Sequence, residues 1–139
     1  MVGPSRGTAG LSVLILLCTP VLVNVGCVAC NNRTIEELNS PNGRQKAVVF
    51  VRDCGATAWF TTEASILSRD DTISPRSKGN IMRVEDDQTA KEPISREGAI
   101  EVRLEWKGDA LLNVSVPKKA VVDWQIARLG RIRIDYRRF

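Results

Sequence analysis

The chain of 139 residues contains no histidine. This absence removes the imidazole that a Ser/His/Asp or Cys/His relay needs, and it removes a preferred side-chain ligand of zinc. Paired carboxylates or a lysine could still serve an enzyme, but hydrolase and metalloenzyme chemistry become much less favoured. We therefore expect no catalytic residue, no metal site and no cofactor, and we lean against an enzyme.

Cysteine is scarce, with four in the chain, and only Cys54 lies beyond the N-terminal segment; the others are Cys18, Cys27 and Cys30. They lack neighbouring ligand residues, which argues against a metal site. In an oxidising compartment Cys54 can form a disulfide with Cys27 or Cys30, and Cys30–Cys54 is the candidate pair. If one of those two is lipidated and the other is removed by cleavage, Cys54 is left as a lone thiol.

Charge is absent from one long stretch of the chain. No charged residue lies between Arg6 and Arg33, and residues 1–30 combine an early positive charge, an apolar run and small residues before cysteines. This layout is typical of a secretory signal, and Pro20 interrupts the apolar run, which suits a signal better than a straight spanning helix. The segment predicts export of the rest of the chain.

The small residues before Cys27 and Cys30 are those of a bacterial lipoprotein cleavage box, so both cysteines are lipidation candidates. Three positions earlier stand Asn24 and Cys27, respectively, where an aliphatic residue is usual. Two alternatives remain open: plain secretion after cleavage near Ala29, and an uncleaved anchor helix, because residues 9–30 are 22 uncharged residues, enough to cross a bilayer. All three readings place the domain outside the cytoplasm, tethered in the periplasm or at the cell surface, or secreted.

No helical pattern of comparable length and no internal repeat follow the N-terminal segment, whereas alternation of apolar and polar residues recurs. We expect a mainly β fold, a small antiparallel sheet or β-sandwich of about six to seven strands. Residues 1–30 are the signal or anchor, residues 31–39 a tether or a short first strand, and residues 40–139 a single β-rich domain.

Strong turn and strand signals open this domain. Ser40-Pro41-Asn42-Gly43 predicts a turn. Residues 46–52 predict a buried strand, and residues 58–67 alternate as a half-exposed strand that pairs with it in a hairpin. A short strand is expected at 81–84, with loops at 53–57, 68–80 and 85–98.

The C-terminal third alternates most clearly. Apolar residues recur at every second position in four segments, 100–107, 112–116, 122–126 and 132–137. This pattern predicts an antiparallel meander with one face on the core and one on solvent. Trp106 and Trp124 lie on the apolar faces and are expected in the core.

Four segments together resemble an uncharacterised family of small bacterial exported proteins, many of which look like lipoproteins. They are Ser40-Pro41-Asn42-Gly43-Arg44, Ala47-Val48-Val49-Phe50, Arg52-Asp53-Cys54-Gly55-Ala56-Thr57 and Gly79-Asn80-Ile81-Met82. The family's pattern runs Ser-Pro-Asp-Gly and then Arg-Asp-Cys-Gly-Ala-Thr, and the resemblance covers about residues 38–139. Asn42 replaces the usual Asp, and Ala58-Trp59 stands where the family has Thr with a small or polar residue. The resemblance implies an extracytoplasmic location and a β domain, and no activity.

The best candidate site is the loop after the first buried strand, with five binding candidates: Arg52, Asp53, Cys54, Thr57 and Trp59. A thiol, a carboxylate, a guanidinium and a hydroxyl on one loop could bind a ligand, and Arg52 could lower the thiol pKa. The structural reading is that Gly55 supplies a turn, Asp53 caps backbone N–H groups, and Cys54 packs or pairs.

The charge balance gives a second, weaker candidate. The net charge is +4, too small to indicate a nucleic-acid-binding protein. Basic residues gather near the C-terminus, at Lys118, Lys119, Arg128, Arg131, Arg133, Arg137 and Arg138. They could contact anionic lipid or another envelope polyanion, or form a solvated sheet face paired with Glu101 and Glu105.

These observations favour an exported, membrane-tethered β domain that is a non-enzymatic binding or structural protein of the cell envelope. Its expected partners are the membrane, through the N-terminal segment or a lipid, and an unidentified envelope component, with no nucleic acid. The alternative is a thiol-dependent enzyme or redox protein centred on Asp53 and Cys54.

Overall fold

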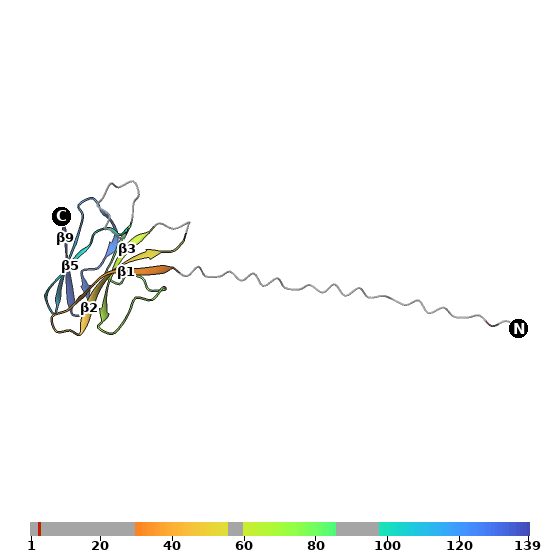
Figure 1. Cartoon of the computed structure of the whole chain (residues 1–139), viewed down its shortest axis with the longest axis horizontal. Coiled ribbons are helices and arrows are strands. Elements are labelled where there is room, and N and C mark those ends of the chain that lie inside the picture. The colour runs from red at the N-terminus through yellow and green to blue at the C-terminus, as the bar shows by residue number, and fades with distance from the viewer. Residues whose placement is uncertain (1–2, 4–29, 56–59, 86–97) are drawn as a thin grey trace.

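The structure is a computed structural model that describes Gly3 and residues 30–55, 60–85 and 98–139 (Figure 1). The described residues form an all-β fold without a helix, which confirms the predicted fold class. The nine strands are β1 (Asn31–Asn39), β2 (Gln45–Asp53), β3 (Thr61–Ser68), β4 (Met82–Glu85), β5 (Arg103–Gly108), β6 (Leu111–Val116), β7 (Val121–Gln125), β8 (Arg128–Leu129) and β9 (Ile132–Arg138). Among these residues there is no helix long and apolar enough to span a membrane.

The strands form two sheets that enclose one apolar core. The first sheet has the order β1-β2-β3-β4-β7, and the second has the order β5-β6-β9-β8. Buried side chains from both sheets meet between them, among them Val49, Ile66, Val84, Leu112 and Ile134. Alternation along each strand sends these residues inward and their neighbours outward, which is the basis of a two-layer β fold.

Residues 31–39, for which both a tether and a first strand were considered, form strand β1. It pairs antiparallel with β2 over its whole length, from Asn31 opposite Asp53 to Asn39 opposite Lys46. The register shifts at Ile35, whose side chain packs against the core. The domain therefore begins at β1 and not at Ser40, because backbone pairing and one apolar anchor suffice to order a polar segment on a sheet edge.

The predicted hairpin of a buried strand and its partner is confirmed as the antiparallel pair β2–β3. The prediction that the second strand is half-exposed is wrong, because every residue from Thr61 to Ile66 is buried. Residues 74–80 lie over the outward side of the first sheet. The N–H of Asn80 donates to Ser65 Oγ at 3.1 Å, and its amide nitrogen donates to Ile66 O at 2.8 Å. Alternation within a strand does not predict that a distant loop will cover its polar face, so the burial of this face was not predicted.

The predicted C-terminal meander is only partly correct. Strands β5 and β6 form the expected antiparallel hairpin, and Gly130 turns the chain between β8 and β9 with a φ of 56°. Strand β7, however, crosses to the first sheet and pairs with β4, and β6 pairs with β9 in parallel. Alternation identifies which face of a strand is buried and carries no information about its neighbour.

The two C-terminal tryptophans have different environments. Trp106 packs against the core as expected, and its indole N–H donates to Leu38 O at 3.0 Å, joining β5 to β1. Trp124 instead lies outside the core, opposite Arg83, because the β4–β7 register shifts between Arg83 and Val84. This irregularity turns Trp124 to the outward face of the first sheet, away from the side of Val122.

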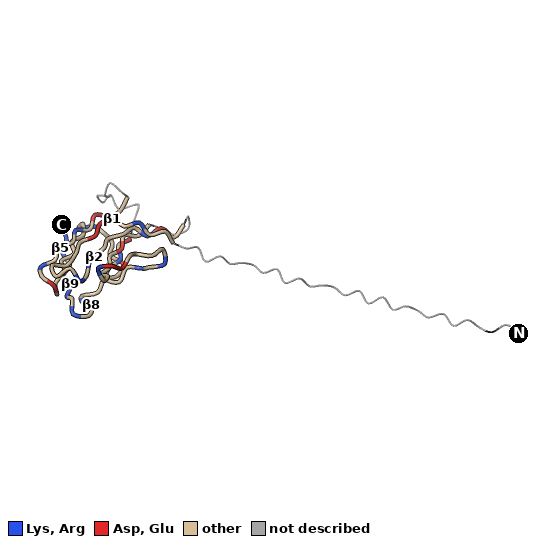
Figure 2. Tube along the Cα trace, turned by 60° about the horizontal axis from the view of Figure 1, so that its bottom comes forward, with Lys and Arg blue, Asp and Glu red and all other residues tan. Residues whose placement is uncertain are grey.

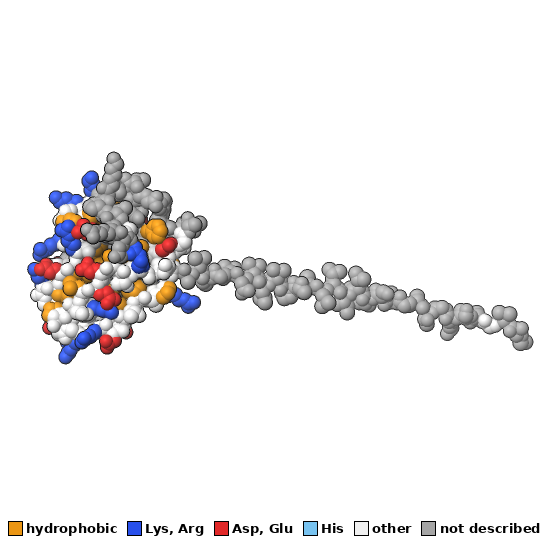
Figure 3. All heavy atoms as spheres, in the orientation of Figure 1, with side chains coloured by type: hydrophobic (Ala, Val, Ile, Leu, Met, Phe, Trp, Pro, Cys, Tyr) orange, Lys and Arg blue, Asp and Glu red, His pale blue; other side chains and the backbone are white. Residues whose placement is uncertain are grey.

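Charged side chains cover the outside of both sheets. Lys and Arg alternate with Asp and Glu around the domain (Figure 2). On the face drawn in Figure 3, the hydrophobic side chains of the described residues form separate spots among charged ones. The face drawn in Figure 3 is thus a mixed-charge surface in its described part.

Candidate functional site

A disulfide joins the start of strand β1 to the end of strand β2. Cys30 directly precedes β1 and Cys54 directly follows β2, so the pairing of Asn31 with Asp53 brings the cysteines opposite one another. Their Sγ atoms are bonded, with a Cα–Cα distance of 4.1 Å. The sequence left Cys27 and Cys30 open as partners of Cys54, and the structure uses Cys30. Cys27 lies outside the described residues.

A hollow of about 510 Å³ lies beside this disulfide on the outward face of the first sheet. Strands β2, β3, β4 and β7 each contribute to its walls. The lining residues are Cys30, Arg52, Cys54, Thr61, Glu63, Lys78, Arg83, Glu85 and Trp124. Its volume is within the range of pockets that hold small ligands, and its walls combine three cations, two carboxylates and one aromatic side chain.

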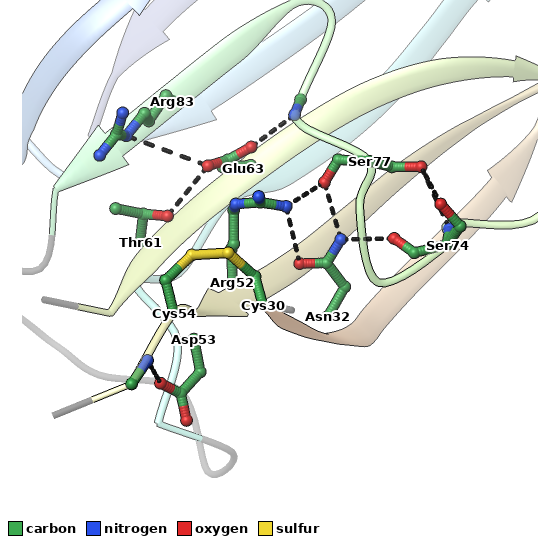
Figure 4. Close-up of a disulfide and its surroundings, with 12 residues drawn as sticks. Cys30, Asn32, Arg52, Asp53, Cys54, Thr61, Glu63, Ser74, Ser77 and Arg83 are labelled. Carbon is green, nitrogen blue, oxygen red and sulfur yellow. Dashed lines mark hydrogen bonds and ion pairs between the residues drawn. A yellow bond between two sulfur atoms is a disulfide. The ribbon is translucent and has the colours of Figure 1, made fainter. Parts of the chain in front are cut away.

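Glu63 is the buried charge at this site, with only 2% of its surface exposed. The Thr61 hydroxyl donates to Glu63 Oε1 at 3.0 Å, and the N–H of Gly79 donates to Oε2 (Figure 4). Arg83 Nε lies 3.9 Å from Oε1, and Arg83 Nη1 lies 3.6 Å from Asp123 Oδ2. A buried carboxylate is stable when such partners offset its lost hydration, so Glu63 is fully engaged within the protein.

Arg52 fixes the loop that borders the hollow. Its Nη1 donates to Ser77 O and lies 3.4 Å from Asn32 Oδ1. The Asn32 amide nitrogen donates to Ser74 O and Ser77 O, both at 2.7 Å. Figure 4 shows these bonds as a chain from β1 and β2 to the loop. Arg52 therefore positions one wall of the hollow as well as lining it.

Close packing of Gly79 completes this wall. A Cβ atom at this position would lie 2.8 Å from Met82 O and 2.9 Å from Ala64 O, closer than real Cβ contacts. The absence of a side chain thus lets the N–H of Gly79 approach the buried carboxylate of Glu63. Arg52 and Gly79 lie in the third and fourth of the four segments on which the expected resemblance rests, so those two segments meet at this site.

The described residues of the candidate loop predicted from the sequence lie on two different sides of the first sheet. Arg52 and Cys54 line the hollow, whereas Asp53 points to the other side of the sheet because strand residues alternate. Asp53 Oδ1 accepts a hydrogen bond from the N–H of Gly55 at 2.9 Å, and Gly55 has a φ of 97°. This is the capping and turn role considered for both residues. Thr57 and Trp59 lie outside the described residues.

Six lining residues were not among the candidates predicted from the sequence: Thr61, Glu63, Lys78, Arg83, Glu85 and Trp124. Glu63 had a usable signal, since it is the one charged residue between Asp53 and Arg69. An isolated charge within an apolar strand is often buried with partners. Arg83 and Trp124 gave no such signal, because they meet only through the β4–β7 pairing.

The hollow provides hydrogen-bond donors for a ligand and few groups that could act as a nucleophile, an acid or a base. Arg83 Nε is buried and has no hydrogen-bond acceptor in the described part of the chain. Lys78 has neither an ion pair nor a hydrogen bond with any described residue. Within the described ranges, no group of three potential metal ligands occurs. Cys54 Sγ is bonded to sulfur, so it has no thiolate while the disulfide is intact.

The basic C-terminal region forms a solvated sheet face. Arg133 Nε lies 3.2 Å from Asp135 Oδ1, and Arg103 lies 3.7 Å above the Phe139 ring. Hydrogen bonding from Lys107 holds the pKa of Glu105 below its usual range. The Arg133–Asp135 and Lys107–Glu105 pairs each lie along a single strand, and of the C-terminal cations considered as partners of Glu105, Arg137 makes a smaller contribution to its lowered pKa. Exposed pairs of this kind contribute little to stability.

Comparison with known proteins gave no matching family model, no similar curated protein and no similar solved structure.

Proposed function

We propose that this chain is an exported, membrane-tethered β domain that binds a component of the cell envelope without catalysing a reaction. The observation that carries the proposal is the disulfide between Cys30 and Cys54, placed where the targeting segment joins the domain. Disulfides form and persist in extracytoplasmic compartments and are rare in the cytosol. The disulfide therefore supports export independently of the apolar N-terminal segment.

The same bond favours one of the two lipidation candidates. A sulfur atom in a disulfide cannot also form a thioether to a diacylglycerol, so pairing of Cys30 with Cys54 leaves Cys27 to carry the lipid. Cleavage after Gly26 then places only Val28 and Ala29 between the lipidated residue and Cys30. The tether is short, and the disulfide lies at the membrane-proximal end of the domain.

Binding is favoured over catalysis by the state of the reactive groups. The thiolate that a cysteine nucleophile needs is absent while Cys54 is paired. Both oxygens of Glu63 are engaged by Thr61 and Gly79, which removes this carboxylate as a free acid or base. What remains is a preformed hollow with cationic donors and an aromatic wall, features that recognise a ligand.

The runner-up is a thiol-redox protein. The observation in its favour is that both Cys30 and Cys54 line the hollow, where a substrate dithiol could reach their sulfur atoms. Alkylation of the exported protein without added reductant separates the two functions. The binding proposal predicts no labelling of Cys54, whereas rapid labelling of a reduced Cys54 supports the redox function.

Matched serine variants test the tether. The full chain with its own leader is expressed in a bacterium, and the membrane and soluble extracytoplasmic fractions are compared. We expect Cys27→Ser to move the domain into the soluble fraction and Cys30→Ser to leave it in the membrane, because only Cys27 carries lipid. A membrane-bound Cys27→Ser together with a soluble Cys30→Ser would contradict the assignment.

A further inference from the structure

We infer that the hollow beside the disulfide binds a phosphate ester, with Lys78 and Arg83 as the recognition residues. This inference rests on the proposed binding function and names the chemistry of the ligand. Three cations, Arg52, Lys78 and Arg83, line one concavity. Guanidinium and ammonium groups that converge on one space are the usual means by which proteins bind phosphate.

The two carboxylates at the hollow do not cancel these cations. Glu63 is buried, and its oxygens accept from Thr61 and Gly79 and face the Arg83 guanidinium, so its charge is compensated within the wall. Glu85 is exposed and can turn into solvent. The donors that remain for a ligand thus come mainly from cationic side chains.

Unused donors identify where the phosphate oxygens would lie. Arg83 Nε is buried and makes no hydrogen bond with the described residues. It faces Glu63 Oε1 at 3.9 Å and Nη1 faces Asp123 Oδ2 at 3.6 Å, so the guanidinium is ion-paired but keeps hydrogen-bond donors for a ligand. Lys78 contributes an ammonium group without a protein acceptor in the same part of the chain. Arg52 uses Nη1 for both of its hydrogen bonds, which leaves the other guanidinium donors available.

The size and the aromatic wall favour an ester over a bare phosphate ion. About 510 Å³ is large enough for a phosphate with an attached glycerol or sugar. Trp124, half-buried on β7, supplies a flat apolar surface on which such a carbon skeleton can pack. An inorganic anion alone would leave that surface uncovered.

The position of the hollow makes a lipid headgroup one source of this phosphate. Cys30 lines the hollow, and three extended residue steps from a lipidated Cys27 span about 10 Å. Headgroup phosphates therefore lie within reach of the site. A soluble phosphate ester has the same chemistry and is the other source.

The test uses the mature chain carrying Cys27→Ser, which lacks the lipid anchor, and follows tryptophan fluorescence. The probes are glycerol 1-phosphate, inorganic phosphate, and vesicles of phosphatidylcholine with and without phosphatidylglycerol. We expect glycerol 1-phosphate to bind more tightly than inorganic phosphate. Binding to phosphatidylglycerol vesicles without binding of the soluble ester assigns the phosphate to the membrane, and comparable binding of the soluble ester assigns it to a soluble source.

Paired variants locate the site. Lys78→Gln should weaken binding about tenfold, the usual order for a charge-assisted contact, whereas exposed Lys119→Gln should leave it unchanged. Arg83→Lys keeps the positive charge but loses the planar guanidinium that can donate two parallel hydrogen bonds, so it should also weaken binding. No binding of any phosphate probe, or equal losses in both lysine variants, would overturn the inference. Binding of a neutral envelope sugar in the hollow would overturn it while leaving the proposed binding function intact.

Discussion

Individual residues at the hollow both stabilise its wall and shape the space proposed to bind a ligand. Glu63 organises its wall: it accepts from the backbone of Gly79 and the side chain of Thr61, and it faces Arg83. Burying such a charge is costly unless every lone pair is served, so each partner depends on the others. Changes at supporting residues should therefore alter both stability and the shape of the site.

Gly79→Ala tests this dependence. The added Cβ meets two backbone carbonyls at 2.8 and 2.9 Å, which cannot move aside as a flexible side chain could. We expect a loss of about 1–3 kcal/mol in the free energy of unfolding, measured by urea denaturation, and weaker ligand binding. Thr72→Ala, at an exposed position in the same loop, is the control. Equal stability of the two variants would mean that the loop does not pack on β3 as described.

Tyr136 gives a pH-dependent prediction at the same scale. Its hydroxyl lies 2.8 Å from Ile81 O and 3.1 Å from Ile126 O, and burial raises its pKa to about 12. The folded chain then holds the phenolic proton more tightly than the unfolded chain. The stability from this group is present below the ordinary pKa of about 10 and is lost as the pH rises towards 12.

Tyr136 is the single tyrosine in the chain, so tyrosinate absorbance reports on it alone. We expect its titration midpoint well above that of free tyrosine. Tyr136→Phe should unfold about 1 kcal/mol more easily at neutral pH and should lose this contribution to the alkaline decline in stability. A midpoint at the free-tyrosine value would show that the hydroxyl does not join β9 to the first sheet.

Among the elements, strand β1 is a polar edge strand that directly follows residues 1–30, the proposed signal or anchor. It is held at one end by the Cys30–Cys54 disulfide and near the other by the indole N–H of Trp106 on Leu38 O. Ile35 provides its apolar anchor in between. These three attachments hold the edge strand on the domain along its length.

Removing the disulfide should expose this dependence. Cys30→Ser and Cys54→Ser each open a cross-link between residues 24 positions apart, which should cost about 3 kcal/mol of stability. The double variant should cost no more than either single variant, because one bond is lost in every case. Hydrogen exchange should quicken most at the Asn31–Asp53 end of the β1–β2 pair. Additive losses would show that the cysteines act separately.

Element positions were easier to predict from the sequence than their neighbours. The buried strand of residues 46–52 follows from its near-continuous apolar run, its hairpin partner follows from alternation, and a short apolar segment predicts the strand near Glu85; each occurs in the structure. The transfer of β7 to the first sheet and the parallel β6–β9 pair did not follow, because strand order depends on long-range pairing. The same limit applies to the site. Arg52 and Cys54 were predicted because they are close in sequence, whereas Trp124 reaches the hollow only through the β4–β7 register.

At the scale of the whole molecule, the disulfide connects location with function. It stands between the leader and the domain, occupies the one cysteine beyond the N-terminal segment, and forms a wall of the hollow. Under the proposed function, this bond sets the cationic donors of the hollow beside the lipid tether. Reduction would free Cys54, release β1 from β2 at one end and reshape that wall, so the proposed binding depends on this bond, whereas the proposed lipid anchor at Cys27 does not.

Mass spectrometry of the protein recovered from a bacterium, alkylated before and after reduction, tests the account most directly. The predicted result is a mature chain that begins at Cys27 and carries a diacylglycerol there. It should contain no alkylated cysteine before reduction and two afterwards, Cys30 and Cys54. A chain that retains Met1, with its cysteines alkylated without reduction, would contradict the cleaved signal, the lipid tether and the disulfide together.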